Sequence, residues 1–243
     1  MPQSREGQRV PNVTFRLCEN NAWRNVSTAE LFDARTIAVF SVPGAFTPTC
    51  SSTHLPRFNE LAPAFHAAGV DAILCVAVND TFVMNEWARS QECRNIVMIP
   101  DGNGEFTDGM GMLVDKTGLG FGKRSRRYSM LVRNGIVDKM FVEPDEPGDP
   151  FKVSDADTLL DHVAPDALRP DRIVVFSKVG CPYCARARQL LSDHDMEYVE
   201  VPLDHNIRGK VLGAVSGSMT APQVFINGRH IGGAEALGLY LQR

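Results

Sequence analysis

The pattern of hydrophobic and polar residues divides the chain into two stretches, and predicted strands alternate with predicted helices in each. In the first stretch, continuous apolar runs at 36–41 and 70–78 predict buried strands, and 95–99 predicts a shorter one. Apolar residues at helical spacing after residue 51, and again after the capping segment 79–81, predict a helix behind each of the first two strands. This alternation predicts a largely parallel sheet that is covered by helices.

Two hairpins and two shorter helices are also expected in the first stretch. The hairpins are expected at 10–23, with a turn at 19–22, and at 128–142. The helices are expected at 106–114 and from Ser154 to Val163. The second hairpin has the clearer signal, because Asn134-Gly135 separates its two apolar runs and favours a tight turn.

Pro63 lies inside the helix that follows residue 51 and predicts a kink or an early end there.

A proline-bracketed segment at 164–171 is the best candidate for a domain boundary. We therefore expect a first domain at 1–164, a linker at 165–171 and a second, smaller α/β domain at 172–243. The pattern of the second domain predicts three strands, three helices and a final hairpin. The strands are expected at 173–176, at 198–201 and at 224–226, and the last of these forms the hairpin with residues 230–231. The helices are expected to end near His194, to span 207–215 and to begin after Gly232-Gly233.

Composition places the chain among ordinary globular proteins, with 44% hydrophobic and 22% charged residues in a total of 243. The formal net charge of −4 argues against a nucleic-acid or anionic-membrane partner. No apolar run reaches the length of a transmembrane helix, and the first residues lack the apolar core of a signal peptide. The six cysteines do not have the spacing of a secreted disulfide framework, so we expect a cytoplasmic protein.

Cys50 follows the predicted strand at 36–41 and precedes a predicted helix. Unpaired amides and the positive end of a helix dipole favour a thiolate at such a position. A buried cysteine that serves only in packing is the alternative, and Cys50 and its neighbours alone do not decide between the two.

A second cysteine motif, Cys181-Pro182-Tyr183-Cys184, also follows a strand and opens a helix. This spacing allows the two thiols to meet across one helical turn, and the helix N-terminus lowers the pKa of the first. Lys178 adds positive charge nearby. Half of a zinc site is the alternative, but no second Cys or His pair with ligand spacing follows, so redox chemistry is favoured.

Residues 172–243 resemble the glutaredoxins through three features in the expected order: the C-P-Y-C motif, Thr220-Ala221-Pro222 and Gly232-Gly233. The resemblance implies redox roles for Cys181 and Cys184 and a cis proline at Pro222. It also implies a glutathione site. That site would comprise Lys178, Tyr183, Thr220, Ala221, Pro222, Gly232, Gly233 and Glu235. Ala221 stands where valine is usual, and Glu235 alone replaces the usual acidic pair.

Residues 8–163 resemble the type-five peroxiredoxins. Pro43, Thr47 and Cys50 match the signature P-x-x-x-T-x-x-C, and N-D-x-F-V and R-R-Y-S-M follow further along the chain. The resemblance implies that Cys50 attacks peroxides, that Pro43 shields its sulfur and that Thr47 hydrogen-bonds the peroxide. Together, the two resemblances imply two thioredoxin-like domains, each with a mixed central sheet flanked by helices.

The peroxide-positioning arginine of that family corresponds to Arg127, and a guanidinium there would stabilise a thiolate and orient a peroxide. The alternative is a solvated basic patch, because 123–127 is a run of charged residues. His54 could orient its neighbours, although a histidine on the first turns of a helix is more often a satisfied surface or core residue.

No cysteine follows Glu143-Pro144-Asp145, where type-five enzymes that resolve their own sulfenic acid carry one. The whole chain resembles the bacterial hybrids of peroxiredoxin and glutaredoxin. This resemblance implies a glutathione-dependent peroxidase for hydrogen peroxide and alkyl hydroperoxides, with glutathione as co-substrate and glutathione reductase as an indirect partner. It further implies a homodimer or tetramer, without a metal or a tightly bound cofactor. The alternatives are a protein deglutathionylase or disulfide reductase, and a non-enzymatic peroxide sensor.

Overall fold

The computed structural model describes residues 4–19, 21–204, 207 and 209–242. The chain forms two compact units, and the division between them falls between Arg169 and Pro170, inside the segment expected to be a linker. Each unit is described by itself below. No helix of the described residues is both long enough and apolar enough to cross a membrane.

The first unit is built on a five-stranded sheet with the strand order β5-β4-β3-β8-β9. Its strands are β3 (Thr36–Ser41), β4 (Ala72–Ala77), β5 (Val97–Pro100), β8 (Tyr128–Arg133) and β9 (Ile136–Val142). The first three run parallel to one another, and β8 and β9 are antiparallel to their neighbours. The sheet is therefore mixed, as the resemblances imply, with a parallel part at β3, β4 and β5 as the alternating pattern predicts, and the Asn134-Gly135 hairpin is confirmed.

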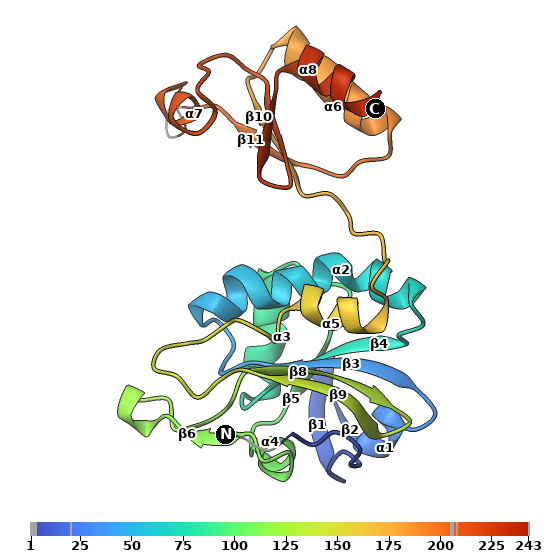
Figure 1. Ribbon diagram of the computed structural model, residues 1–243. Helices are drawn as coiled ribbons and strands as arrows, with labels where there is room; N and C mark the ends of the chain where they lie inside the picture. Colours follow the sequence, from blue (N-terminus) through green and yellow to red (C-terminus); the bar gives the residue numbers. More distant parts are fainter. Residues whose placement is uncertain (1–3, 20, 205–206, 208, 243) are drawn as a thin grey trace. The chain divides into compact units, whose positions relative to one another are not determined.

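Successive residues of β3 point to opposite faces of this sheet, and each face has its own apolar core. Ala38 and Phe40 belong to the core beneath helices, whereas Ile37 and Val39 belong to the core on the other face. The helices of the first face are α2 (Leu55–Ala67), α3 (Thr81–Ser90) and α5 (Ala156–Val163). The other face is covered by β1 (Thr14–Glu19), β2 (Ala22–Ser27), α1 (Thr28–Phe32) and α4 (Glu105–Gly109) (Figure 1).

The predicted first hairpin is present as the antiparallel pair β1–β2, although Asn20 of its turn lies outside the described residues. The helix expected at 106–114 is wrong beyond Gly109, because Gly111 has a left-handed backbone (φ +71°) that an α-helix does not accommodate. The chain forms a small antiparallel sheet there instead. Its strands are β6 (Leu113–Asp115) and β7 (Lys123–Ser125), and a 3₁₀ turn, η2 (Thr117–Leu119), lies between them.

Pro63 does not end α2, which continues to Ala67. A proline inside a helix removes the N–H that would bond to the carbonyl four residues earlier. That carbonyl belongs to Asn59, and it accepts a hydrogen bond from Asn95 Nδ2 at 3.2 Å instead. The expected shortening is therefore wrong, because a side chain from a neighbouring loop satisfies the freed carbonyl group.

The second unit contains a mixed four-stranded sheet with the order β11-β10-β12-β13. Its strands are β10 (Ile173–Ser177), β11 (Val199–Pro202), β12 (Gln223–Ile226) and β13 (Arg229–Gly232), and its helices are α6 (Pro182–Asp193), α7 (Gly209–Ser216) and α8 (Ala234–Leu241). Helices α6 and α8 lie side by side and pack on one face of the sheet (Figure 1). The helix expected from residue 207 begins at Gly209, and Arg208 lies outside the described residues.

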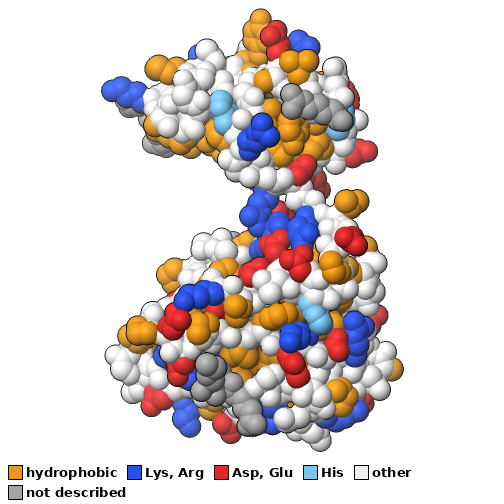
Figure 2. All heavy atoms as spheres, in the orientation of Figure 1, with side chains coloured by type: hydrophobic (Ala, Val, Ile, Leu, Met, Phe, Trp, Pro, Cys, Tyr) orange, Lys and Arg blue, Asp and Glu red, His pale blue; other side chains and the backbone are white. Residues whose placement is uncertain are grey.

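Acidic and basic side chains are interspersed on the face of the molecule shown in Figure 2. Several charged side chains form ion pairs near the end of the first unit. Arg169 bonds to Asp157 at 3.1 Å and also to Asp161, and Arg57 pairs with Asp157 at 2.7 Å. These contacts attach the last residue of the first unit to α5 and α2.

Candidate active site

Cys50 lies in the first unit at the start of a π-helical turn, η1 (Cys50–His54), between β3 and α2. Its side chain is fully buried and belongs to the core on the helical face of the sheet. The neighbouring Ser51 accepts a hydrogen bond from Trp87 Nε1 at 3.0 Å, which connects the turn to α3. The predicted position of Cys50, between a strand and a helix, is therefore confirmed.

Thr47 places its hydroxyl group on the sulfur. Its Oγ1 lies 2.8 Å from Cys50 Sγ and 2.9 Å from the carbonyl oxygen of Gly44. A hydroxyl group has one proton and two lone pairs, so it cannot donate to both groups at once. Thr47 can accept from a Cys50 thiol while it donates to Gly44, and it can donate to a thiolate after the proton has left.

Arg127 is a buried residue of the site, with a side chain only 2% exposed. Its Nη1 donates to Cys50 Sγ at 3.4 Å and to His54 Nδ1 at 3.2 Å. Its Nη2 donates to both carboxylate oxygens of Asp149, at 2.6 and 2.5 Å. The alternative of a solvated basic patch is therefore wrong for Arg127, because a carboxylate from another segment compensates its buried charge.

His54 is a neutral partner of this arginine. A guanidinium can only donate, so His54 Nδ1 accepts from Arg127, and Nε2–H donates to the carbonyl oxygen of Ser154 at 3.0 Å. Burial, together with the nearby positive charge of Arg127, lowers the pKa of His54 to about 3. The ring therefore stays neutral near physiological pH and holds one edge of the guanidinium.

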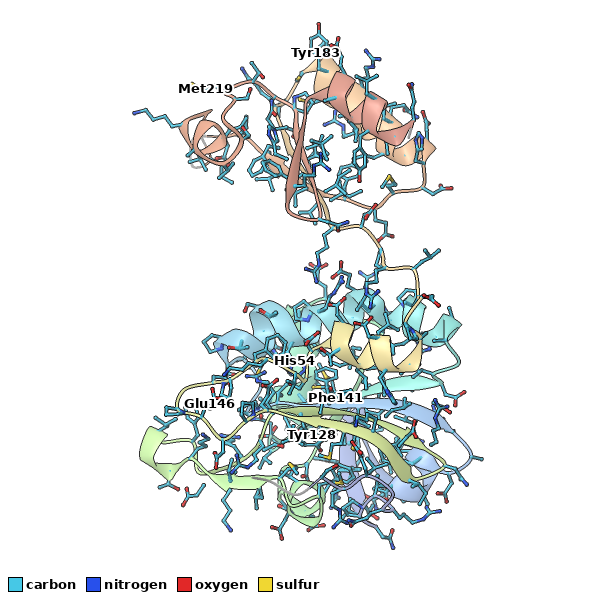
Figure 3. The ribbon with its side chains drawn as sticks, viewed as in Figure 1. His54, Tyr128, Phe141, Glu146, Tyr183 and Met219 are labelled. Carbon is cyan, nitrogen blue, oxygen red and sulfur yellow. The ribbon has the colours of Figure 1, made fainter. Side chains whose placement is uncertain are left out.

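The loop that follows β9 carries Asp149 and is held by a buried carboxylate. Glu143 accepts hydrogen bonds from the backbone N–H groups of Lys152, Val153 and Ser154, at 2.8–2.9 Å. In Figure 3, His54 lies between α2 and the sheet, and Glu146 lies on this loop. The loop is thus anchored at its base beside the site.

A cavity of about 470 Å³ opens beside the site. Pro43, Thr47, Arg127 and Asp149 line it, and further apolar lining comes from Pro48, Val114, Leu119, Phe121, Pro144 and Pro150. Three predicted site residues therefore face one space that can admit a small molecule. Cys50 itself lies deeper, within hydrogen-bond distance of Thr47 and Arg127.

The second unit has a different cysteine site. Cys181 is the N-cap of α6, and its Sγ accepts a hydrogen bond from the backbone N–H of Cys184 at 3.2 Å. Hydrogen bonds from Cys184 and the backbone, together with the positive charge of Arg188, lower the pKa of Cys181. Burial and its contact with Cys181 raise the pKa of Cys184 to about 11. The predicted inequality of the two thiols is confirmed, and the positive charge of Arg188 contributes to it.

One segment implied by the glutaredoxin resemblance lies beside Cys181, and a second segment packs against the first. The Ala221–Pro222 peptide bond is cis, as expected, and Ala221 O lies 3.5 Å from Cys181 Sγ. Gly233 packs against the backbone of Pro222, where an added Cβ would lie 3.7 Å from the Pro222 oxygen, and Gly232 has φ +119°. The structure therefore places the Ala221 backbone beside the sulfur and Gly233 beside Pro222.

The remaining side chains predicted to bind glutathione are exposed, namely Lys178, Tyr183, Thr220 and Glu235. Lys178 lines a separate open cavity of about 510 Å³ with Arg188 and Glu200. Tyr183 lies at the start of α6 in Figure 3, and Glu235 lies in the first turn of α8. Their roles in binding glutathione stay predictions. Within the part of the chain that the structure describes, no group of three or more His, Cys, Asp or Glu residues could hold a metal ion.

Comparison with known proteins places both units in families. A Redoxin family model matches residues 5–160, and a Glutaredoxin family model matches residues 173–231. The chain is 60% identical to the hybrid peroxiredoxin hyPrx5 of Haemophilus influenzae, over 98% of both chains. The chain belongs to the hybrid peroxiredoxins. It joins a redoxin domain to a C-terminal glutaredoxin domain, and it is a peroxidase and therefore an oxidoreductase.

The peroxiredoxin unit also resembles single-domain proteins. Peroxiredoxin sll1621 of Synechocystis is 47% identical over 64% of this chain and 89% of its own. The reduced Prx3 of Vibrio vulnificus in complex with hydrogen peroxide is 40% identical with a TM-score of 0.62, over 65% of this chain and 98% of its own. The 1-Cys peroxiredoxin of Plasmodium falciparum is 35% identical with a TM-score of 0.63, over 66% of this chain and 99% of its own. These similarities confirm the predicted fold of the peroxiredoxin unit.

Two residues of the peroxiredoxin site were absent from the predicted set. Asp149 lies in an acidic, proline-rich loop, and its sequence gives no sign that it reaches a buried arginine. His54 was considered, but the pattern did not favour an active-site role. Its position four residues after Cys50, on the turn that follows the sulfur, was the available signal.

Proposed function

We propose that Cys50 is the cysteine that reduces peroxides, and that glutathione and the glutaredoxin unit together return it to the thiol. The position of Cys50 Sγ carries the proposal: it lies 2.8 Å from Thr47 Oγ1 and 3.4 Å from Arg127 Nη1, beside a cavity lined by both residues. A buried sulfur with two such neighbours suits a small substrate that must be bound and polarised at once.

In the first step, the Cys50 thiolate attacks one peroxide oxygen, and the O–O bond breaks. Cys50 becomes a sulfenic acid, and the other oxygen leaves as water or an alcohol after it takes a proton. Arg127 would stabilise the charge that develops on the oxygens, and Thr47 would hydrogen-bond the peroxide. Pro43 would shield the sulfur from water.

We infer that an external thiol takes the next step. Burial raises the pKa of Cys75 well above that of an ordinary thiol, and burial also raises the pKa of Cys93 to about 11. Neither is therefore suited to attack a sulfenic acid as a thiolate. The segment from Glu143 to Ser154 has no cysteine. Glutathione would condense with the sulfenic acid to give a Cys50–glutathione disulfide and water.

The glutaredoxin unit would then remove the glutathionyl group. The low-pKa Cys181 thiolate attacks the glutathione sulfur, frees the Cys50 thiolate and becomes glutathionylated itself. A second glutathione releases Cys181 and leaves as oxidised glutathione. The glutathione contacts would include Lys178, Tyr183, Thr220, Ala221, Pro222, Gly232, Gly233 and Glu235.

Coupling to glutathione reductase tests this proposal. Peroxide and glutathione should sustain continuous NADPH oxidation by the full chain without any other protein. A single stoichiometric oxidation of Cys50 would favour a peroxide sensor instead. Reduction of glutathione mixed disulfides without peroxide turnover would favour a deglutathionylase or disulfide reductase.

The proposal includes an assembly and a location. We expect a homodimer or tetramer, because the peroxiredoxin unit resembles type-five domains, which pair as dimers. Light scattering of the reduced protein would measure the molar mass, and the monomer value of about 26.7 kDa would contradict the expectation. We place the protein in the cytoplasm, where thiols stay reduced.

A further inference from the structure

The hydrogen bonds of the Arg127 guanidinium are divided unequally among its three nitrogens. Nη1 faces Cys50 and His54, and Nη2 faces Asp149. Nε is buried and has no hydrogen-bond partner among the described residues. A buried N–H group of a cation without an acceptor is costly, which indicates that an acceptor from outside the chain completes the site.

The pairing of Asp149 explains why Nε is left over. A carboxylate usually engages two nitrogens of an arginine in a parallel fork. Here both carboxylate oxygens lie on the same nitrogen, Nη2, at 2.6 and 2.5 Å. This end-on contact holds one corner of the guanidinium and leaves the Nε edge without a protein acceptor.

We propose that Asp149 is a positioning residue for the peroxidase reaction: it holds Arg127 so that Nη1 points at Cys50 while Nε–H remains free to bind a peroxide oxygen. This inference rests on the proposed role of Cys50. It requires only the first chemical step, the attack of Cys50 on peroxide, and not the recycling by glutathione.

Asp149 is itself held in place. Its loop is anchored through the three backbone N–H groups that bond to Glu143, and the residue lines the cavity beside Cys50. Burial alone would raise the pKa of the Asp149 carboxyl, but hydrogen bonds from Arg127 and Thr49 outweigh burial and lower it. Asp149 is therefore a carboxylate near neutral pH and can hold the arginine by charge.

The charges around the sulfur predict two separable effects of removing this carboxylate. Three titratable groups face Cys50 and Arg127. They are His54 in the turn before α2, Asp149 in the 143–154 loop and Cys75 in β4. Loss of the Asp149 charge leaves the positive charge of Arg127 less compensated, which does not disfavour a Cys50 thiolate. It does release the guanidinium from its orientation, so the reaction with peroxide, which must also be bound and polarised by the arginine, should slow far more than alkylation.

The experiment compares two reagents for Cys50 in the full chain that carries Cys181→Ser and Cys184→Ser. Hydrogen peroxide needs the arginine donors, whereas iodoacetamide reports only the access and thiolate character of the sulfur. Trp87 bonds to the residue next to Cys50, so its fluorescence should follow the oxidation in a single turnover. Asp145→Asn is the matched control, because Asp145 lies on the same loop and pairs with Arg126 at 2.9 Å.

We expect Asp149→Asn to lower the second-order rate constant for hydrogen peroxide by about tenfold to a hundredfold, the range that a small misplacement of a catalytic group can cost. Alkylation should fall by less than about twofold, and Asp149→Glu should restore most of the peroxide rate. Thr49→Val, which removes a hydrogen bond to Asp149 without changing charge, should give a smaller loss in peroxide rate only.

Four outcomes would overturn the proposal. One is an unchanged peroxide rate in Asp149→Asn. Another is a parallel loss with both reagents, which would indicate a general collapse of the site. The third is an equal loss in Asp145→Asn, which would indicate a nonspecific effect of the loop. A Cys50→Ser variant that still consumed peroxide would instead overturn the proposed role of Cys50, and this inference with it.

Discussion

Cys50 and Cys181 each lie between a strand and a helix, but the two units hold their sulfurs by different means. Cys181 is partly exposed, and its sulfur is bonded by the backbone N–H of Cys184, three residues away. Cys50 is fully buried, and its sulfur is bonded by Arg127, which is 77 residues away. A local motif therefore holds the Cys181 sulfur, whereas the Cys50 sulfur has a distant arginine as a partner in addition to the nearby Thr47.

This difference matches the substrates that each site can admit. Thr47 and Arg127 both line the cavity beside Cys50 and contact its buried sulfur, which suits a small peroxide. The sulfur of Cys181 lies beside the exposed Tyr183 and the backbone at Ala221, which suits a bulkier disulfide that must reach it from solvent.

Replacing Cys50 by Ser should reduce peroxide consumption by roughly a thousandfold or more, because the nucleophile itself is lost. The glutaredoxin unit should still reduce small glutathione mixed disulfides at the wild-type rate. Stopped-flow peroxide assays and a mixed-disulfide assay measure the two activities separately. Retained peroxide turnover would move this role to Cys18, Cys75 or Cys93, and Cys50 would no longer be the sulfur that reacts with peroxide.

Arg127→Lys should lower the rate constant for peroxide by about a hundredfold, since an ammonium cannot reproduce the planar contacts to Cys50, His54 and Asp149. The mixed-disulfide activity should not change. Arg126→Lys is the control, because Arg126 pairs with Asp145 at the surface and does not contact the sulfur. A comparable loss in Arg126→Lys, with Arg127→Lys unaffected, would show that Arg126 and not Arg127 has this role.

The two thiols of the glutaredoxin unit should contribute unequally to turnover with glutathione. Cys184→Ser should retain most of the peroxidase activity, because the pKa of about 11 keeps this thiol protonated and only one sulfur is needed to accept a glutathionyl group. Cys181→Ser should lower the peroxidase activity about tenfold, since it removes the attacking thiolate. Steady-state peroxide consumption at matched glutathione concentrations compares the variants. An equal collapse in both would require a dithiol route.

The smallest effect concerns the stability of the peroxiredoxin unit in acid. The pKa of His54 is about 3 in the folded state, below its ordinary value of 6.5, so the unfolded chain binds the extra proton as pH falls below 6.5. This histidine should therefore lower the free energy of unfolding by up to about 1.4 kcal/mol for each pH unit between 6.5 and 3.

Urea unfolding between pH 7 and 5 separates this contribution from that of most carboxyl groups, which stay ionised there. Fluorescence reports the peroxiredoxin unit, since both tryptophans, Trp23 and Trp87, lie in it. His54→Gln should flatten the pH dependence. A wild-type slope in His54→Gln would show that another group titrates in this range.

The sequence by itself determined the features that depend on neighbouring residues. The apolar runs located the strands of both sheets, and Asn134-Gly135 located a hairpin. Cys181 and Cys184 could be assigned as unequal thiols, because an N-cap sulfur and a thiol one turn later differ by the geometry of the helix itself. Thr47 and Cys50 meet for a similar reason, since they are three residues apart in one turn.

Only the tertiary structure decided whether Arg127 faces solvent or sulfur. Within the charged run at 123–127, the pattern does not distinguish a buried arginine from exposed ones. Burial of a guanidinium requires an anion and acceptors placed around it. Asp149 and His54 supply them from 22 and 73 residues away, and the pairing of β3 with β8 brings the arginine to Cys50. Contacts at such separations depend on how the sheet and its loops assemble, which local patterns do not encode.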